Sequence, residues 1–177
     1  MAKPVESLLG LMPPRDEEFF GKDFMPAEAL GALARELTDR HEELHFLRGD
    51  YELQVLWKRT GGAKGGRGIL GKCVAVSGLV RFYSAKDWVI WLSADHVRAH
   101  GFNAQQTEAL LYHEMLHCAL EERDNGGPPK ITTVSHDIEA FNKEIERYGL
   151  WMSDLVATAK VMGAQLSLPL DTPGTPD

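Results

Sequence analysis

The spacing of apolar and polar residues divides the chain into helical and extended stretches. Apolar residues recur at intervals of three and four in segments 27–47, 104–122 and 136–163, which predicts three helices. Segments 51–59, 73–83 and 87–94 are rich in β-branched and aromatic residues and are bounded by turn-forming residues, which predicts three strands. The glycine-rich segment 60–72 is predicted to be a loop.

The order of these elements predicts an α+β fold, with a small mixed sheet of about three strands. The sheet is expected to pack on the N-terminal helix, the middle helix and a long C-terminal helix. The 177 residues suit one domain. We expect a flexible N-terminus over 1–15, the folded domain over 16–163 and a disordered tail over 164–177.

Composition narrows the classes of function. The net charge of −7 disfavours a protein that coats DNA or RNA, because phosphate neutralisation requires a cationic surface. The two cysteines are too few for a disulfide scaffold or a cysteine-based zinc site. The sequence contains neither a signal peptide nor the ~20 apolar residues of a membrane span, so we expect a soluble, cytoplasmic protein with no membrane partner. The candidate metal-binding and catalytic residues are therefore sought among the seven histidines.

Residues His113 to His117 form an HExxH motif inside the predicted middle helix. Four residues at ~100° each bring the second imidazole to within ~40° of the first, so both rings can bind one zinc ion. Glu114 lies on the neighbouring face, where it can take a proton from a zinc-bound water. This arrangement is typical of a zinc hydrolase.

Two other histidine pairs have the same spacing. His41 and His45 also satisfy HExxH, but charged residues surround and interrupt them, which favours an exposed helix surface. His96 and His100 lack the glutamate and are interpreted as loop or cap residues. The uncharged flanks around His113 and His117 favour that pair as the metal site.

A catalytic zinc ion needs a third protein ligand from outside the motif. His136 is the preferred candidate because imidazole suits zinc, and Glu139 is the alternative. Asp137 or Glu139 would then orient the ring of a zinc-binding histidine by a hydrogen bond, without binding zinc itself. For stabilising the oxyanion the sequence offers only Arg147 or Tyr148, which could instead pack the last helix.

Three segments in order carry a family resemblance: DWVIWLSADHVRAHGFNAQQTEALLYHEMLHC (87–118), HDIEAF (136–141) and RYGLW (147–151). Together they resemble the metallopeptidase domain found in many bacteriophage genomes, a small zincin loosely similar to SprT-like proteases, over roughly residues 25–152. The resemblance implies a zincin fold, zinc at His113, His117 and His136, and Glu114 as general base. Tyr112 departs from the aspartate expected before the first ligand.

Two further segments suggest partners. The loop residues Lys58, Arg59, Lys64, Arg67 and Lys72 form a basic patch that could contact an acidic partner or nucleic acid, although a mobile solvated loop is the simpler interpretation. In the tail, residues 165–170 read QLSLPL and resemble the peptide by which bacterial replication and repair proteins bind the DNA polymerase sliding clamp. Its clamp-binding residues would be Gln165, Leu166, Leu168 and Leu170.

The sequence thus predicts a zinc metallopeptidase that hydrolyses peptide bonds of a protein or peptide substrate by Glu-assisted attack of a zinc-bound water. Its tail would recruit it to the clamp, in the host cytoplasm if a phage encodes it. We expect the substrate to lie extended along strand 87–94, beside the motif. The alternative is a non-catalytic, zinc-stabilised adaptor or inhibitor that binds the clamp.

Overall fold

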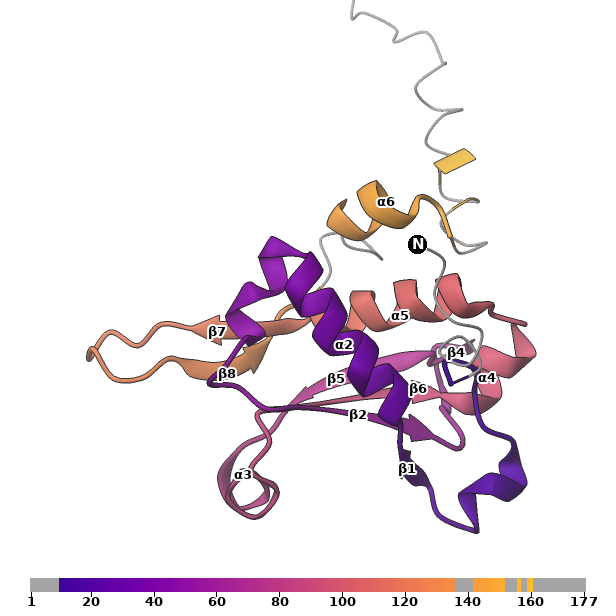
Figure 1. The fold of residues 1–177 in the computed structure, drawn as a ribbon, viewed down its shortest axis with the longest axis horizontal. Helices are drawn as coiled ribbons and strands as arrows, with labels where there is room; N and C mark the ends of the chain where they lie inside the picture. Colours follow the sequence, from indigo (N-terminus) through magenta and orange to yellow (C-terminus); the bar gives the residue numbers. More distant parts are fainter. Residues whose placement is uncertain (1–9, 136–141, 152–155, 157–158, 161–177) are drawn as a thin grey trace, which may run out of the picture.

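The computed structural model describes residues 10–135, 142–151, 156 and 159–160 (Figure 1). The elements of the first half, in chain order, are η1 (Asp16–Phe19), β1 (Phe24–Pro26), α2 (Glu28–Arg40), η2 (Glu42–Leu47), β2 (Leu53–Lys58), β3 (Ala63–Lys64), β4 (Arg67–Gly68) and β5 (Gly71–Ala75). The second half contains α3 (Gly78–Ser84), β6 (Trp88–Ser93), α4 (Ala94–Ala99), α5 (Ala104–Leu116), β7 (Cys118–Glu121), β8 (Lys130–Thr133) and α6 (Asn142–Tyr148). The mixture of helices and a small mixed sheet confirms the predicted α+β class.

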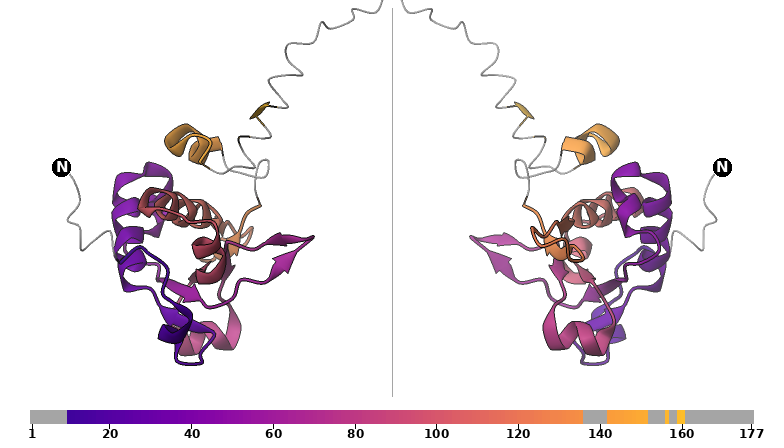
Figure 2. Two further views of the ribbon diagram at one scale, coloured as in Figure 1. Left: turned by 90° about the vertical axis from the view of Figure 1, so that its right-hand side faces the viewer. Right: turned by 90° about the vertical axis from the view of Figure 1, so that its left-hand side faces the viewer.

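The main sheet has four strands in the order β1-β2-β6-β5. The two central strands, β2 and β6, are parallel, and their register pairs Val55 with Ile90. β1 pairs antiparallel with β2, and β5 pairs antiparallel with β6. The described residues also form two separate two-stranded sheets, β3–β4 and β7–β8, and Figure 2 shows the β3–β4 hairpin projecting from the body of the domain.

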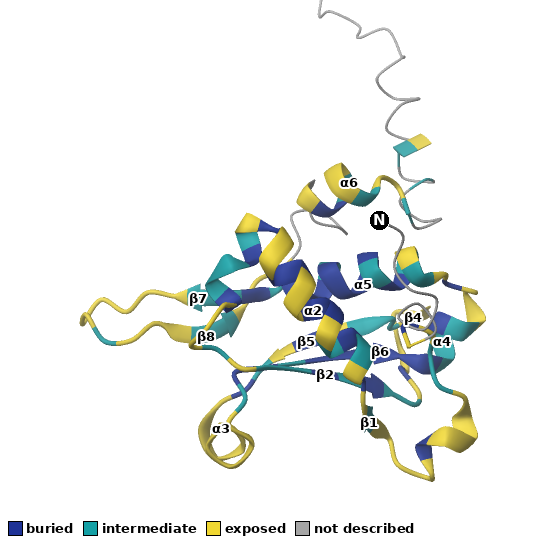
Figure 3. Ribbon diagram, viewed as in Figure 1, coloured by how far each residue is buried: buried dark blue, intermediate teal, exposed yellow. Residues whose placement is uncertain are grey.

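The core lies between one face of the sheet and the two helices that cover it, α2 and α5 (Figures 1 and 3). The buried apolar side chains of α2 recur at helical spacing, at Leu30, Leu33 and Leu37. Those of α5 surround the helix more completely, because it is covered by α2, the sheet and α6. α5 is therefore an interior helix, as the uncharged residues around its HExxH motif suggest.

The first predicted helix is wrong beyond residue 40. α2 ends at Arg40, His41 is extended (φ −120°, ψ 116°), and residues 42–47 form the 3-10 helix η2. The ring of His41 packs edge-on against Tyr112 with centroids 4.9 Å apart, and only 6% of the residue is exposed. α2 therefore ends where the His41 side chain packs against Tyr112, and the spacing of apolar residues does not reveal this contact.

The predicted loop and second strand are also revised. Segment 60–72 contains the hairpin β3–β4 and the start of β5. The strand predicted over 73–83 ends at Ala75, and Gly78, with φ of +54°, leads the chain into the helix α3. Positive φ at Gly78 turns the chain away from the sheet before Leu79, although residues 79–83 have high strand propensity.

The two later helices are shorter than predicted. Asn103 and Gln106 form a reciprocal capping box at the start of α5, with Asn103 Oδ1 accepting from the Gln106 N–H at 2.9 Å, as the sequence predicts. α5 ends at Leu116, and Cys118 already belongs to β7. In the last predicted helix, α6 ends at Tyr148 and Gly149 has φ of +67°, which interrupts the helix.

The packed part of the chain includes some of the N-terminal segment that was expected to be flexible. Leu11 is 3% exposed and belongs to the core cluster, and Arg98 donates to the carbonyl of Pro14. Among the described residues, no helix is long and apolar enough to cross a membrane.

A polar cluster joins η2, α5 and α6. The Arg147 guanidinium donates to both carboxylate oxygens of Glu43, at 2.9 and 3.1 Å, and to the Tyr112 hydroxyl at 3.0 Å. Tyr112 also donates to Glu43. Burial opposes ionisation of Glu43, but these hydrogen bonds and the charge of Arg147 outweigh it and lower the pKa of Glu43 to about 2. The ionised carboxylate therefore holds α6 against the body of the domain.

This cluster predicts a loss of stability in acid. Because the folded-state pKa of Glu43 lies below its ordinary value of 4.5, its contribution is complete above about pH 5 and is lost as the pH falls towards 2. Replacing Glu43 by Gln should lower the free energy of unfolding at pH 7 by about 1 kcal/mol. Urea denaturation at a series of pH values should show a smaller difference between the two proteins at pH 2.5 than at pH 6. A difference that does not change with pH would contradict the assignment.

Candidate metal centre

The HExxH motif occupies the last turn of α5. His113 lies within the helix and His117 is its C-cap residue, with φ of −73° and ψ of −21°. Their ring centroids are 5.2 Å apart and the ring planes meet at 78°. The backbone thus brings the two imidazoles to the same end of the same helix, as the spacing predicts.

His113 is oriented by a carboxylate from α6. Its Nδ1 lies 2.6 Å from Oε2 of Glu144, whose side chain is 1% exposed. The indole N–H of Trp151 donates to the other oxygen, Oε1, at 2.5 Å. Burial alone would lower the pKa of His113, but the hydrogen bond and negative charge of Glu144 outweigh it and raise the pKa. Glu144 therefore holds the ring with its proton on Nδ1.

His117 is oriented by the chain entering from β8. Its Nδ1 donates to the carbonyl oxygen of Val134 at 2.6 Å, and the Val134 N–H donates in return to the His117 carbonyl at 3.0 Å. A carbonyl oxygen can only accept, so the proton of the ring must be on Nδ1. His117 is therefore in the same tautomer as His113, although its Nδ1–H donates to a backbone carbonyl rather than to a carboxylate.

This tautomer is the one in which a histidine binds a metal ion through Nε2. With Nδ1 protonated, Nε2 of each ring carries the lone pair that can bind a cation, and an acceptor behind Nδ1 is the usual support of a ligating histidine. The donors therefore fit zinc. Within residues 10–135 and 142–151, no group of three or more His, Cys, Asp or Glu side chains is arranged to hold a metal ion. The predicted third ligands, His136 and Glu139, lie outside the described residues.

Glu114 points towards the edge strand β5. It is 5% exposed, and its carboxylate lies so close to Gly71 that a β-carbon there would be 2.6 Å from Oε1 and 2.9 Å from Cγ. Burial raises the pKa of Glu114 to about 7, with Glu144 adding to the rise, while the charge of His113 and a hydrogen bond from the Cys73 backbone N–H partly oppose it. A carboxyl group tuned to this range suits proton transfer near neutral pH.

The residues suggested for the oxyanion are engaged elsewhere. Arg147 bonds to Glu43 and Tyr112, and the Tyr148 hydroxyl donates to Oε1 of Glu108 at 3.3 Å. Both side chains therefore serve the docking of α6, which is the packing role that the sequence left open. Asp137 and the tail residues Gln165, Leu166, Leu168 and Leu170 lie outside the described residues.

Glu144 is the residue that sequence reasoning missed. Glu144 orients His113, while Asp137 and Glu139, for which this role is predicted, lie outside the described residues. A signal was present: Glu144, Tyr148 and Trp151 recur at the i, i+4, i+7 spacing of one helical face. A glutamate that shares such a face with two aromatic residues indicates a buried carboxylate, which requires hydrogen-bond donors.

The strand predicted to bind substrate is not at an edge. β6 lies between β2 and β5, so its backbone groups are already paired on both sides. β5 is the edge strand beside the motif. The Leu70 carbonyl accepts from the Ser93 N–H of β6, and the Val76 N–H donates to the carbonyl of Asp87, just before β6. By alternation, Gly71, Cys73 and Ala75 direct their backbone groups away from β6.

The other histidine pairs do not form comparable sites. His41 is buried, which contradicts the predicted exposed surface, and neither of its ring nitrogens has a hydrogen-bond partner in the described structure. Burial lowers the pKa of His41. His96 lies in α4 and His100 is its C-cap residue, so one of the two has the predicted cap role.

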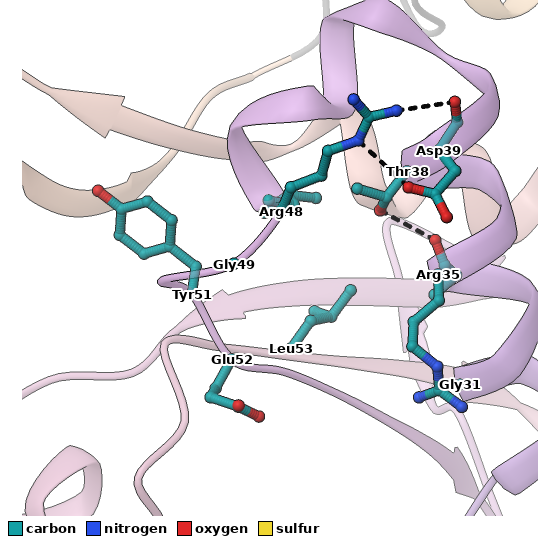
Figure 4. A pocket seen from close by; sticks show the side chains of 11 residues that line it. Gly31, Arg35, Thr38, Asp39, Arg48, Gly49, Tyr51, Glu52 and Leu53 are labelled. Atoms are coloured by element: carbon teal, nitrogen blue, oxygen red, sulfur yellow. Dashed lines mark hydrogen bonds and ion pairs between the residues drawn. The ribbon is translucent and has the colours of Figure 1, made fainter.

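A pocket of about 450 Å³ lies away from this centre, between α2 and the chain that leads into β2 (Figure 4). Arg48 bridges it by bonds to the carbonyl and carboxylate of Asp39, at 2.9 and 3.2 Å. None of the HExxH residues lines it.

The close approach of Glu114 to β5 yields a test. Gly71→Ala places a methyl group within 3 Å of the carboxylate, so the carboxylate must move. In an assay of the peptidase activity that the sequence predicts, a displacement of this kind should reduce kcat/KM about 100-fold. Gly31→Ala on α2 is the matched control, because its β-carbon meets nothing within 4 Å and should stabilise the helix by about 1 kcal/mol without loss of activity. Equal activities of the two variants would contradict this account of the site.

Comparison with known proteins gives one match. No curated protein and no solved structure matches the chain. A family model described as "Putative phage metallopeptidase" matches residues 22–162, which is most of the chain. The match supports a metallopeptidase-like function and implies a metal ion, and it agrees with the resemblance in the sequence. The chain belongs to this phage metallopeptidase family.

Proposed function

We propose that the protein is a zinc-dependent peptidase in which His113 and His117 bind the metal and Glu114 is the general base. The observation that carries the proposal is the pair of Nδ1 contacts, to Glu144 at 2.6 Å and to Val134 at 2.6 Å, which leave both rings in the ligating tautomer. Family membership supports the same class of reaction. The third ligand remains His136, with Glu139 as the alternative.

A bound zinc ion would supply Lewis-acid chemistry, polarising the scissile carbonyl and making water a better nucleophile. Glu114 takes a proton from the attacking water and delivers it to the leaving amine. Its burial against Gly71 keeps bulk water away from the carboxylate. Glu144 and the Val134 carbonyl keep the two imidazoles aligned through the reaction.

The substrate is proposed to pair with β5 rather than with the interior strand β6. Gly71 and Ala75 present outward backbone groups, whereas the outward N–H of Cys73 is taken by Glu114. An extended peptide that adds to this edge gains main-chain hydrogen bonds, and its backbone passes directly beside Glu114. The chemistry and the binding edge therefore meet at Gly71.

The proposed base can be tested without loss of the metal. Glu114→Gln should retain stoichiometric zinc by elemental analysis while kcat/KM for peptide hydrolysis falls at least 100-fold, because the amide cannot accept the proton. Removal of zinc by a chelator should abolish activity, and added zinc should restore it. Glu121→Gln is the control, since Glu121 is an exposed residue of β7 paired with Lys130. A Glu114→Gln protein with wild-type activity would refute the mechanism. If the wild-type and Glu114→Gln proteins have the same effect on replication, the result would favour the non-catalytic adaptor.

We further propose that the tail recruits the enzyme to the bacterial sliding clamp. The basis is the sequence of residues 165–170, in which a glutamine precedes alternating leucines. Such a peptide binds as an extended segment, with the glutamine at the rim of a pocket and the leucines in an apolar groove.

Clamp recruitment predicts measurable binding of the whole protein to purified β clamp. The double substitution Gln165→Ala with Leu168→Ala should reduce this affinity at least tenfold in a calorimetric titration, because both anchoring contacts are lost. The same variant should cleave a short peptide at the wild-type rate. Identical clamp binding by both proteins would exclude the motif as the binding site.

A further inference from the structure

Positive charge is concentrated in one part of this acidic protein. Residues 53–86 contain seven of the 19 basic residues and none of the 26 acidic ones. The run covers β2, the hairpin β3–β4, β5 and α3. The seven basic residues are Lys58, Arg59, Lys64, Arg67, Lys72, Arg81 and Lys86. Arg59, Arg81 and Lys86 form ion pairs with Asp23, Asp87 and Glu52, which lie just outside the run. The positive charge near the candidate active site therefore comes mainly from Lys58, Lys64, Arg67 and Lys72, although the net charge of the chain is −7.

The hairpin β3–β4 is fixed to the domain at its base. The carboxylate of Asp95 accepts from the Gly61 N–H at 3.0 Å and from the Ser93 hydroxyl. The ring of His96 packs against the hairpin so closely that a β-carbon on Gly68 would lie 2.2 Å from its Nδ1. The tip, which carries exposed Lys64 and Arg67, is therefore held in a defined position before β5 begins.

The helix α3, at the other end of β5, has an apolar surface that nothing in the described structure covers. None of its residues is buried, and four large side chains are mostly exposed: Leu79 71%, Val80 68%, Phe82 79% and Tyr83 78%. A helix with apolar residues on most sides normally packs against a partner. Arg81 fixes its position through Asp87 at the start of β6, with Nη2 2.7 Å from Oδ1.

β5 begins shortly after this hairpin and ends shortly before α3, and two of its side chains lie on the face of the sheet where α3 lies. Cys73 points inward, with its sulfur 3.5 Å from that of Cys118, so Lys72 and Val74 point to the opposite face and are exposed. In Figure 1, α3 also lies on the side of the sheet away from α5. A strand added to the β5 edge places alternate side chains on that same face, opposite Lys72 and Val74.

We propose that this edge selects extended polypeptide segments that are acidic on the hairpin side and apolar on the α3 side. Lys72, supported by Lys64 and Arg67, recognises carboxylates by charge complementarity. Val74 and α3 receive large apolar side chains. Since β5 spans five residues, or ~17 Å at ~3.3 Å per residue, the acidic and apolar groups are separated by about five residues of the substrate. The inference rests on the proposed function and specifies its substrate class.

The test compares matched ten-residue peptides with the zinc-loaded full chain. One peptide has glutamates in one half and leucine and phenylalanine in the other; in its analogues the glutamates become glutamine, the apolar residues become serine, or both change. The wild-type kcat/KM should be at least tenfold higher for the first peptide than for the doubly changed one. The preference for glutamate over glutamine should weaken as the salt concentration rises.

Two variants separate the contributions of the surfaces. Lys64→Glu with Lys72→Glu should reduce the preference for glutamate at least tenfold, while Leu79→Ser with Phe82→Ser should reduce only the preference for apolar residues. The matched control is Lys130→Glu on β8, an exposed lysine on a different hairpin, which should change neither ratio. A wild-type protein that does not discriminate among the peptides would overturn the proposal.

Binding distinguishes this proposal from the catalytic one. The Glu114→Gln protein should bind the fluorescently labelled glutamate peptide at least tenfold more tightly than the glutamine peptide, in an anisotropy titration. If no peptide is cleaved by wild type but this difference is found, the peptidase mechanism fails and the binding site stands. If a labelled oligo(dT) binds more tightly than the acidic peptide, and the Lys64→Glu with Lys72→Glu variant loses it, the surface is a nucleic-acid site and the proposal is wrong.

Discussion

The contact between Glu114 and Gly71 is the constraint on which the site depends. Without a β-carbon at Gly71, α5 can lie directly over the edge strand β5, and its carboxylate is desolvated between the two. Once this side chain faces β5, helical geometry directs the remaining groups. Around the helix, His113 is ~100° and His117 ~60° from Glu114, so neither ring points in the same direction as the carboxylate. One missing methyl group thus fixes the rotation of the helix about its own axis.

The site lies where the core meets elements that are attached to it. α5 is held by the core it shares with α2 and the sheet, so the HExxH residues begin from a rigid support. The groups that orient the histidines come from outside that core, from α6 through Glu144 and from the end of β8 through Val134. The positions of His113 and His117 are therefore set by packing, and their tautomers by hydrogen bonds to more peripheral segments.

Local signals in the sequence were sufficient for the parts of the structure that local interactions determine. Short-range patterns predict the capping box at Asn103 and the strands β2 and β6. The uncharged residues around His113 likewise indicate that its helix is buried. The errors occur where distant contacts decide. The helical pattern continues past Arg40, but η2 and the burial of His41 depend on Tyr112, 71 residues later. The order of the strands could not be predicted from the sequence either. β6 lies between β2 and β5, which leaves β5 at the edge, and the residue pattern of β6 does not show which strands pair with it.

The Glu43–Arg147 pair links residues 104 positions apart, which has a consequence for folding. Closing so long a loop costs chain entropy before the contact contributes anything, so contacts of this separation tend to form late. The sheet, α2 and α5 are formed by residues that leave the ribosome before α6 does. Glu144 reaches His113 only when α6 docks. The order of synthesis therefore keeps His113 without its orienting carboxylate until α6 has been made, so a nascent chain can fold much of its core before the candidate metal centre is complete.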